Sequence, residues 1–554
     1  MVYAVVFTAL PIVAVAWAWT VGAVNVPKWD DHGALKGFLM ALNEETSVSG
    51  AVALFVKQHN EHRIAYDRLL AWLDYSLFGK LSFVRLMACG NLSLLGIVSL
   101  LGVVLARYTK PWYLFLPPIT LLLVSLAHWE NLYWAMASIQ NFSVVFWVLW
   151  SLYALSHRSN PALAIGLAVV ASLVSGNGLL VWPVSTLVLL LQRRFQLLPY
   201  WLGVTAALFA AYFWTYVQPA TNPPVRGTVA EFVIGWLAFL GAAADALPIT
   251  QTYWPAAITG ALLVAFWGYV LVTAAPTVWR KTALSPLDSF MPGAVAFLVG
   301  TALVVVWGRY GFGRDILLTS RYRVYSLTLL AFTYVYSVSV IYKNYPFWTA
   351  GLGFTIGGVI WWSAFVVNTH ESLLLRRYLL TSQYNWTYTT NRPIPVVDAA
   401  TRRVIDNAPA YYDSVLPMLF SDPTGASFPV DSVFKNDQQY VIRLGLAGVR
   451  AVGDPSLANP DRGMSVLLRS SGRTYLYGGF AAPRRNWRVL VGRLPRYVTN
   501  VPIDVVIPAS DLAPGTYEVA VLGCTNSTSC RVYPTGRLLT VAPHAAAIEV
   551  NKNW

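Results

Sequence analysis

Long apolar runs recur along the first two thirds of this 554-residue chain and constrain its fold more than any other feature. A run of about 20 apolar residues is long enough to cross the hydrocarbon core of a membrane as a helix. The composition agrees, because 56% of the residues are hydrophobic and 12% are charged, against about 25% charged residues in ordinary soluble proteins. We therefore expect an α-helical polytopic membrane protein. An ordinary soluble enzyme, a disordered protein and a fibrous repeat are excluded.

Eleven of these runs are candidate transmembrane helices. Two of them, Pro161–Val174 and Leu179–Leu191, are short and are separated by Ser175–Gly178, so we expect a kinked or partly re-entrant pair. The other nine candidates are Met1–Val24, Phe83–Ala106, Trp112–Ala127, Phe142–Ser156, Leu197–Val217, Pro255–Thr273, Ser289–Trp307, Val324–Ile341 and Phe347–Val367.

Lys and Arg residues fall in alternate loops between these runs, and the positive-inside rule places such loops in the cytoplasm. This orientation puts the N-terminus in the cytoplasm and everything after Val367 on the outer side. Val229–Leu247 is then a surface or re-entrant helix, because another crossing would move the Arg280–Lys281 loop outside. The first run lacks the basic start of a signal peptide and is expected to be retained. The residues used are Arg107, Lys110, Arg158, Arg193, Arg194, Arg280, Lys281 and Lys343.

The chain is expected to divide at residue 367 into a transmembrane domain, 1–367, and an outer β-rich domain, 368–554. Residues 25–82 form the first outer loop, with short helices at the membrane interface. Short alternating segments separated by Gly and Pro turns are typical of an antiparallel sandwich. The expected strands are Met464–Arg469, Thr474–Gly478, Trp487–Val491, Ile503–Ile507, Thr516–Leu522 and Arg531–Thr540.

Cysteine use is consistent with an outer location for the second domain. Cys524 and Cys530 lie six residues apart, a spacing that suits a disulfide across a hairpin in an oxidising compartment. Cys89 is alone in an apolar run and is interpreted as inert packing. No CxxC pattern of a metal site is present.

Ionisable residues are concentrated in the first outer loop. The adjacent carboxylates Asp30 and Asp31 can hold a divalent cation or act as a general base, and the alternative is an ordinary helix N-cap. His59 and His62, three residues apart, are expected to share a helix face. They would act there as metal ligands, as groups that bind sugar hydroxyls, or only as hydrogen-bonded structure.

Two further groups of residues lie on the same side of the membrane in this topology. Gly308–Arg323 carries four arginines where positive charge is disfavoured, which indicates an anionic ligand or, alternatively, anchoring at the membrane surface by Arg and Tyr. The candidates in this segment are Arg309, Arg314, Arg321, Tyr322 and Arg323; those in other outer turns are His128, Glu130 and Asn177.

Carboxylates beside arginines suit a reaction with a phosphate leaving group. The carboxylate removes a proton from an acceptor hydroxyl, and the guanidinium groups neutralise the departing phosphate. No Walker A loop, Rossmann Gly-rich turn or G-x-S-x-G elbow in a usable context is present, so ATP-driven transport and serine hydrolysis find no support.

These motifs resemble those of the GT-C superfamily of polytopic glycosyltransferases, which use polyprenyl-phosphate sugars. Asp30–Asp31 is similar to the acidic motif of their first outer loop. Gln58–Arg63, His128–Asn131 and Gly311–Tyr322 are similar to motifs of a poorly characterised bacterial group that is usually assigned to the superfamily. The resemblance covers about residues 1–367.

The resemblance implies a GT-C-like fold and an inverting transfer, with Asp30 or Asp31 as the base. The alternative places the acid/base work within His59–Arg63, at His59, Glu61 or His62, because this stretch is not a general superfamily feature. Asp31 and Glu130 are the candidate ligands if a cation, Mg²⁺ or Mn²⁺, is needed. The implied donor-phosphate contacts are Arg63, Arg309, Arg314, Arg321, Tyr322 and Arg323, and the implied acceptor site contains His128, Glu130 and Asn177.

The leading hypothesis is a glycosyltransferase in the bacterial inner membrane, moving a sugar from a polyprenyl-phosphate donor to an envelope glycan, lipid or protein. Its partners are then these substrates and membrane lipids, and no nucleic acid, since the net charge of +14 is explained by membrane loops and the outer domain. The alternatives are an O-antigen polymerase or ligase with a diphosphate-linked donor, a lipid-linked glycan flippase or transporter, and a non-catalytic scaffold. The β domain resembles a carbohydrate-binding module. Its basic stretch, Arg484–Arg496, suits an anionic polysaccharide or is only a solvated edge.

Overall fold

The computed structural model describes residues 2–158, 160–219, 227–249, 252–280, 282–388, 427–436, 439–445, 452–453, 455–471, 474–479, 503–526 and 529–543. The chain forms two compact units. The first contains Met1–Trp17 and Thr46–Phe365, and the second contains Ala18–Glu45 and Val366–Trp554.

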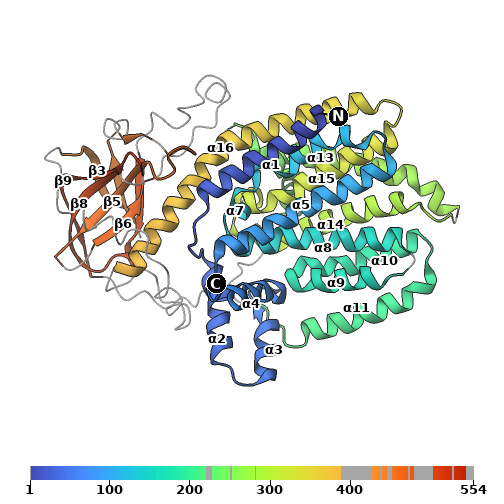
Figure 1. Ribbon diagram of the computed structural model, residues 1–554, viewed down its shortest axis with the longest axis horizontal. Helices are drawn as coiled ribbons and strands as arrows, with labels where there is room; N and C mark the ends of the chain where they lie inside the picture. The colour runs from blue at the N-terminus through green and yellow to red at the C-terminus, as the bar shows by residue number, and fades with distance from the viewer. Residues whose placement is uncertain are drawn as a thin grey trace. The chain divides into compact units, whose positions relative to one another are not determined.

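The protein is a multi-pass helical membrane protein with a C-terminal β-sheet domain (Figure 1). Nine helical segments of the described chain are long and apolar enough to span a membrane, and they lie at nine of the eleven predicted positions. The other two predicted spans, now Ala162–Val174 and Gly176–Leu191, are shorter apolar helices, as is Val229–Leu240.

The helices that contribute to the first unit differ greatly in length. The segment Trp112–Leu132 is broken into short pieces, because Pro117 and Pro118 begin a new helix and Ser125 caps the next turn. The helices are α1 (Val2–Gly22), α3 (Val48–Val56), α4 (Ala65–Phe78), α5 (Phe83–Tyr108), α6 (Pro117–Leu123), α7 (Trp129–Leu132), α8 (Ala135–His157), α9 (Ala162–Val174), α10 (Val181–Leu191), α11 (Leu198–Phe213), α12 (Val229–Leu240), α13 (Tyr253–Trp279), α14 (Pro286–Arg309), α15 (Arg323–Tyr336) and α16 (Pro346–Tyr388).

Small residues let neighbouring helices of the first unit approach closely. Helices α5, α8 and α9 lie side by side (Figure 1), and Ser93 on α5 is hydrogen-bonded to Ser143 on α8 at 2.9 Å. Between α12 and α13 the contact is closest at Gly241 and Gly260. A Cβ on either residue would come within 2 Å of a carbonyl oxygen of the other helix. Close backbone packing through small residues is a common means of joining helices in membranes.

Alternate loops of the first unit gather at two opposite ends of the helix bundle. At one end Leu284 N donates to Leu191 O at 3.0 Å, and Tyr108 is hydrogen-bonded to His157 at 2.9 Å. At the other end, the loop before α4 contacts the end of α14, at Glu61 and Arg309. We call this second end the cluster end. Most of the candidate site residues that were predicted from the sequence lie there.

The second unit is built around an antiparallel β sandwich, as predicted. One sheet has the order β3-β4-β7 and the other β6-β5-β8-β9. Apolar side chains of both sheets, such as Ile442 and Val505 opposite Val466 and Val519, form its core. The strands are β3 (Val430–Asn436), β4 (Gln439–Leu444), β5 (Gly463–Arg469), β6 (Thr474–Gly478), β7 (Ile503–Pro508), β8 (Gly515–Cys524) and β9 (Cys530–Val541).

Five of the six predicted strands are found at β5 to β9, and the sixth, Trp487–Val491, lies outside the described residues, as does the basic stretch Arg484–Arg496. Strands β3 and β4 were not predicted from the sequence. The predicted disulfide joins Cys524 and Cys530, which are cross-strand partners at the ends of β8 and β9. It is consistent with an extracytoplasmic domain.

The predicted start of the β-rich region at residue 368 falls inside a helix. Helix α16 continues to Tyr388 because the stretch after His370 is rich in helix-forming Leu and Arg residues. Its last part belongs to the sandwich unit. There the Asn385 side chain donates to Leu476 O at 2.9 Å and accepts from Leu476 N at 2.8 Å.

Candidate functional site

Residues 58–63 form a two-stranded hairpin in which β1 (Gln58–His59) pairs with β2 (His62–Arg63). The expectation that His59 and His62 share a helix face is therefore wrong, and the two are cross-strand partners. Asn60, at the turn, has φ +48°, a left-handed conformation that Asn adopts more readily than most residues. The spacing was ambiguous because a tight turn and a helical turn both bring residues i and i+3 together.

Side-chain hydrogen bonds to main-chain atoms fix this hairpin against the end of α11. Gln58 Nε2 donates to Val217 O at 2.6 Å, and Gln58 Oε1 accepts from Val217 N at 2.9 Å. The buried Arg63 guanidinium donates to Tyr212 O and Val56 O, both at 2.6 Å. Arg63, which was predicted to contact the donor phosphate, thus has a positioning role for the hairpin in this structure.

Glu61 projects from the hairpin turn and forms an ion pair with Arg309 at the end of α14. Arg309 Nη2 lies 3.2 Å from both carboxylate oxygens of Glu61. Each side chain keeps between a fifth and a third of its surface exposed, so the pair remains accessible to a ligand. Burial and the Glu61 charge both raise the pKa of the nearby Tyr216 phenol.

His62 connects this ion pair to the turn before α10. Its Nδ1 accepts a hydrogen bond from Gly176 N at 3.1 Å. The neutral imidazole therefore carries its proton on Nε2, which lies 4.0 Å from Glu61 Oε2. A Cβ at position 176 would lie 2.9 Å from His62 Nδ1, so a side chain there would displace the imidazole. Glycine at this turn thus allows the close approach of His62.

The next residue, Asn177, extends the network into the bundle. Its Nδ2 donates to the hydroxyl of Tyr325 on α15 at 3.0 Å. The Tyr325 ring packs on Phe239 of α12, and Phe239 also packs on Tyr322. Through these rings the Glu61–Arg309 pair is connected to the 3-10 turn that contains Arg321.

Glu130 holds that turn in place. Its Oε2 accepts hydrogen bonds from Ser320 Oγ at 2.8 Å and from Arg321 N at 3.4 Å. Asn131 adds a bond to Arg321 O at 2.9 Å. The Arg321 guanidinium lies over the rings of Trp134 and Tyr322. Ser320 and Asn131 were not predicted as site residues, although each adjoins a predicted one.

The loop-end cluster is defined by Glu61, His62, Asn177, Arg309, Glu130 and Arg321, all at the cluster end of the first unit. It combines two carboxylates, a histidine whose Nδ1 accepts a hydrogen bond, an amide and two arginines. Such a set can remove a proton from a hydroxyl group and stabilise negative charge that develops on a phosphate. These residues come from four separate connections between the long helices of the first unit.

Arg323 is buried and differs from its neighbours. It forms an ion pair with Asp245 and also donates to the carbonyl oxygens of Leu318 and Ala127, each at 3.3 Å. Thr252 donates a further hydrogen bond to Asp245. These contacts indicate a structural role for Arg323. The sequence contained a signal for this pair. Asp245 is a lone carboxylate in an apolar run, and such a carboxylate requires a compensating positive charge.

Arg314 and His128 complete the predicted set in the first unit. Arg314 is exposed, lies over the Tyr253 ring, and lines a cleft of about 430 Å³ with Asp315 and Thr319. His128 is fully buried and its Nε2 bonds to Leu123 O at 3.0 Å. It therefore lies within the bundle rather than on an open surface.

Asp30 and Asp31 belong to the second unit. Asp31 begins a π-helical segment, Asp31–Gly37, and its buried carboxylate accepts a hydrogen bond from Lys28 N at 3.0 Å. Burial, aided by the Lys36 charge, lowers the pKa of the next residue, His32, to about 3. A cation ligand role for Asp31 or Glu130 stays a prediction. In the described parts of the chain, no three His, Cys, Asp or Glu side chains form a metal-binding group.

Comparisons with protein-family models, curated proteins and solved structures found no match for this chain. The contacts of the loop-end cluster are therefore the basis for a functional assignment.

Proposed function

We propose that this protein is a membrane glycosyltransferase that transfers a sugar from a polyprenyl-phosphate donor to a hydroxyl group of a cell-envelope acceptor. The observation that carries the proposal is the partly exposed Glu61–Arg309 pair beside His62. The resemblance of Gln58–Arg63 and Gly311–Tyr322 to GT-C motifs supports the same class. The disulfide between Cys524 and Cys530 supports an outer location for the β domain.

In the proposed reaction Glu61 acts as the general base. The acceptor hydroxyl gives its proton to the Glu61 carboxylate, and the acceptor oxygen attacks the anomeric carbon of the donor. The bond from that carbon to the phosphate oxygen breaks, and its electron pair remains on the polyprenyl phosphate. Arg309 and Arg321 neutralise this charge, so one glycosidic bond forms as one phosphoester bond breaks. Attack from the face opposite the phosphate inverts the configuration.

His62 and Glu130 position these groups. The hydrogen bond from Gly176 N to His62 Nδ1 fixes the imidazole ring with its Nε2 proton near Glu61. This proton orients the Glu61 carboxylate or an acceptor hydroxyl. Glu130 fixes the main chain of Arg321 through Ser320. The side chain of Arg321 lies over two aromatic rings, a surface that also suits the apolar face of a sugar.

The test is turnover of a synthetic polyprenyl-phosphate monosaccharide by the purified full-length protein in lipid nanodiscs, with an envelope-glycan fraction added as the acceptor, measured as released polyprenyl phosphate by mass spectrometry. We expect Glu61→Gln to lower the rate by at least about 100-fold, the usual contribution of a general base. The matched control is Asp504→Asn, which removes another carboxylate paired with an arginine, Arg443, in the β domain. Its rate should equal that of the wild type.

Two results would contradict this assignment. The first is turnover at the wild-type rate by Glu61→Gln and no turnover by an Asp30→Asn/Asp31→Asn variant. That result would place the base in the second unit. Turnover of a diphosphate-linked oligosaccharide in preference to the monophosphate would favour the polymerase or ligase alternative.

A further inference from the structure

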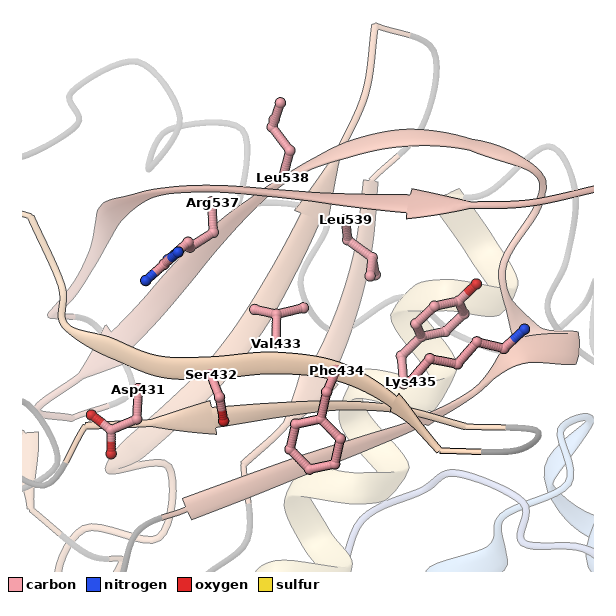
Figure 2. A pocket seen from close by; sticks show the side chains of 9 residues that line it. Asp431, Ser432, Val433, Phe434, Lys435, Arg537, Leu538 and Leu539 are labelled. Carbon is pink, nitrogen blue, oxygen red and sulfur yellow. The ribbon is translucent and has the colours of Figure 1, made fainter.

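The two sheets of the sandwich leave a cleft of about 420 Å³ between the edge strands β3 and β9. Figure 2 shows β9 above β3, with Val433 and Leu539 projecting into the space between them and Phe434 and Leu538 pointing away from it. The cleft is separate from the loop-end cluster, which belongs to the first unit.

The floor of this cleft is apolar. Val433 on β3 and Leu539 on β9 point toward each other in Figure 2. Side chains alternate along a strand, so Lys435 lies on the same face as Val433, and Arg537 lies on the same face as Leu539. One cation therefore flanks the apolar floor on each strand.

Both cations are exposed at the rim of the cleft. Neither Lys435 nor Arg537 has an ion-pair partner among the residues that the structure describes, and Lys435 lies 5.8 Å from the centre of the Tyr440 ring. Asp431 and Ser432 add a carboxylate and a hydroxyl group to the lining. The two cations outnumber this single carboxylate, so the lining carries a net positive charge that favours a negatively charged ligand.

The lining extends along a strand and does not converge on one point. Asp431 and Lys435 are separated by four residues, about 13 Å at a rise of about 3.3 Å per residue. Figure 2 shows Arg537 toward the Asp431 end of the lining and Lys435 at the other end, so a single small anion would reach one cation only. An extended chain that carries acidic groups, hydroxyl groups and apolar ring faces would use the cations, the Asp431 and Ser432 oxygens and the Val433–Leu539 floor together.

We infer that the β3–β9 cleft binds an acidic glycan, and, resting on the proposed function, that this glycan is the acceptor. Lys435 and Arg537 contact its carboxylate groups, and the C–H faces of the sugar rings lie on the floor. The cleft then retains the acceptor chain while its end is extended.

Binding can be measured by calorimetry with the full-length protein in nanodiscs and tetragalacturonic acid as the probe, without any donor. We expect binding by the wild type, about tenfold weaker binding by Lys435→Gln and by Arg537→Gln, and unchanged binding by Arg531→Gln. Arg531 is the matched control, since it is an exposed arginine on the same strand but outside the cleft.

Maltotetraose and tetraglutamate separate the ligand classes. If neutral maltotetraose bound as tightly as tetragalacturonic acid, the inference that the ligand is acidic would be overturned. If tetraglutamate bound as tightly, the ligand would be an acidic peptide and not a glycan. No binding of tetragalacturonic acid, or equal weakening by Arg531→Gln, would overturn the inference. Glu61→Gln should bind the probe as the wild type does, so failure of the cleft and failure of the proposed transfer are distinguished.

Discussion

Four arginines lie between residues 309 and 323, and their surroundings separate them into different kinds. Arg309 is partly exposed and paired with Glu61, whereas Arg314 keeps 65% of its side chain exposed. Arg321 lies over two aromatic rings, and Arg323 keeps 4% of its side chain exposed and is paired with Asp245. Because an arginine remains charged in every one of these places, its role follows from its partner and its access to ligand.

The Arg323–Asp245 pair gives a prediction at this scale. Asp245→Asn leaves the buried Arg323 charge uncompensated and should destabilise the protein by about 3 to 5 kcal/mol, measured as a lower thermal unfolding midpoint. The control is the double variant Arg323→Met/Asp245→Leu, which removes both charges and should recover most of the loss. A single variant as stable as the wild type would contradict a buried ion pair.

At the scale of the elements, close contacts with neighbouring main chains or side chains determine where glycine is needed. Gly260 on α13 and Gly241 after α12 let the two helices meet, and Gly176 admits His62. Gly268, also on α13, has open space beyond its Cα hydrogen. The same residue type on the same helix is thus indispensable at one position and replaceable at another.

We predict that Gly260→Ala destabilises the protein whereas Gly268→Ala does not. A Cβ at 260 would lie 1.9 Å from Leu237 O, so α12 and α13 must separate, at a cost of about 1 to 3 kcal/mol. Alanine at 268 gains helix propensity of up to about 1 kcal/mol. Thermal unfolding of the two purified variants, followed by circular dichroism, measures the difference, and equal midpoints would argue against this helix contact.

At the scale of the whole molecule, the alternation of loops between two ends of the bundle determines which residues can meet. Glu61 and Arg309 are 248 positions apart in the sequence and still form an ion pair. The basic loops that contain Arg107, Arg194 and Arg280 are at the other end. Basic loops at that end are consistent with the proposed orientation, in which the cluster end faces outward.

Labelling of cysteines in intact cells tests that orientation. In a Cys89→Ser background, Asp315→Cys at the cluster end should react with a membrane-impermeant maleimide, since Asp315 is 94% exposed. Thr282→Cys, exposed at the opposite end, should react only after the cells are lysed. The reverse pattern would place the cluster end in the cytoplasm.

The sequence by itself determined the class of the molecule. Nine of the eleven predicted apolar runs are long helices in the described chain, and period-two patterns with turn residues predicted the sandwich and five of its described strands. These signals are local, since each depends on the burial of neighbouring residues in one element. The spacing of Cys524 and Cys530 was sufficient for the same reason.

The tertiary structure decided which candidates meet. The sequence could not show that Glu61 pairs with Arg309, that His62 accepts a hydrogen bond from Gly176, or that Asp30 and Asp31 belong to another unit. Each of these facts depends on how distant loops return to one end of a bundle. Residue type and spacing limit what a side chain can do, but long-range packing determines the partner and the solvent access that decide what it does.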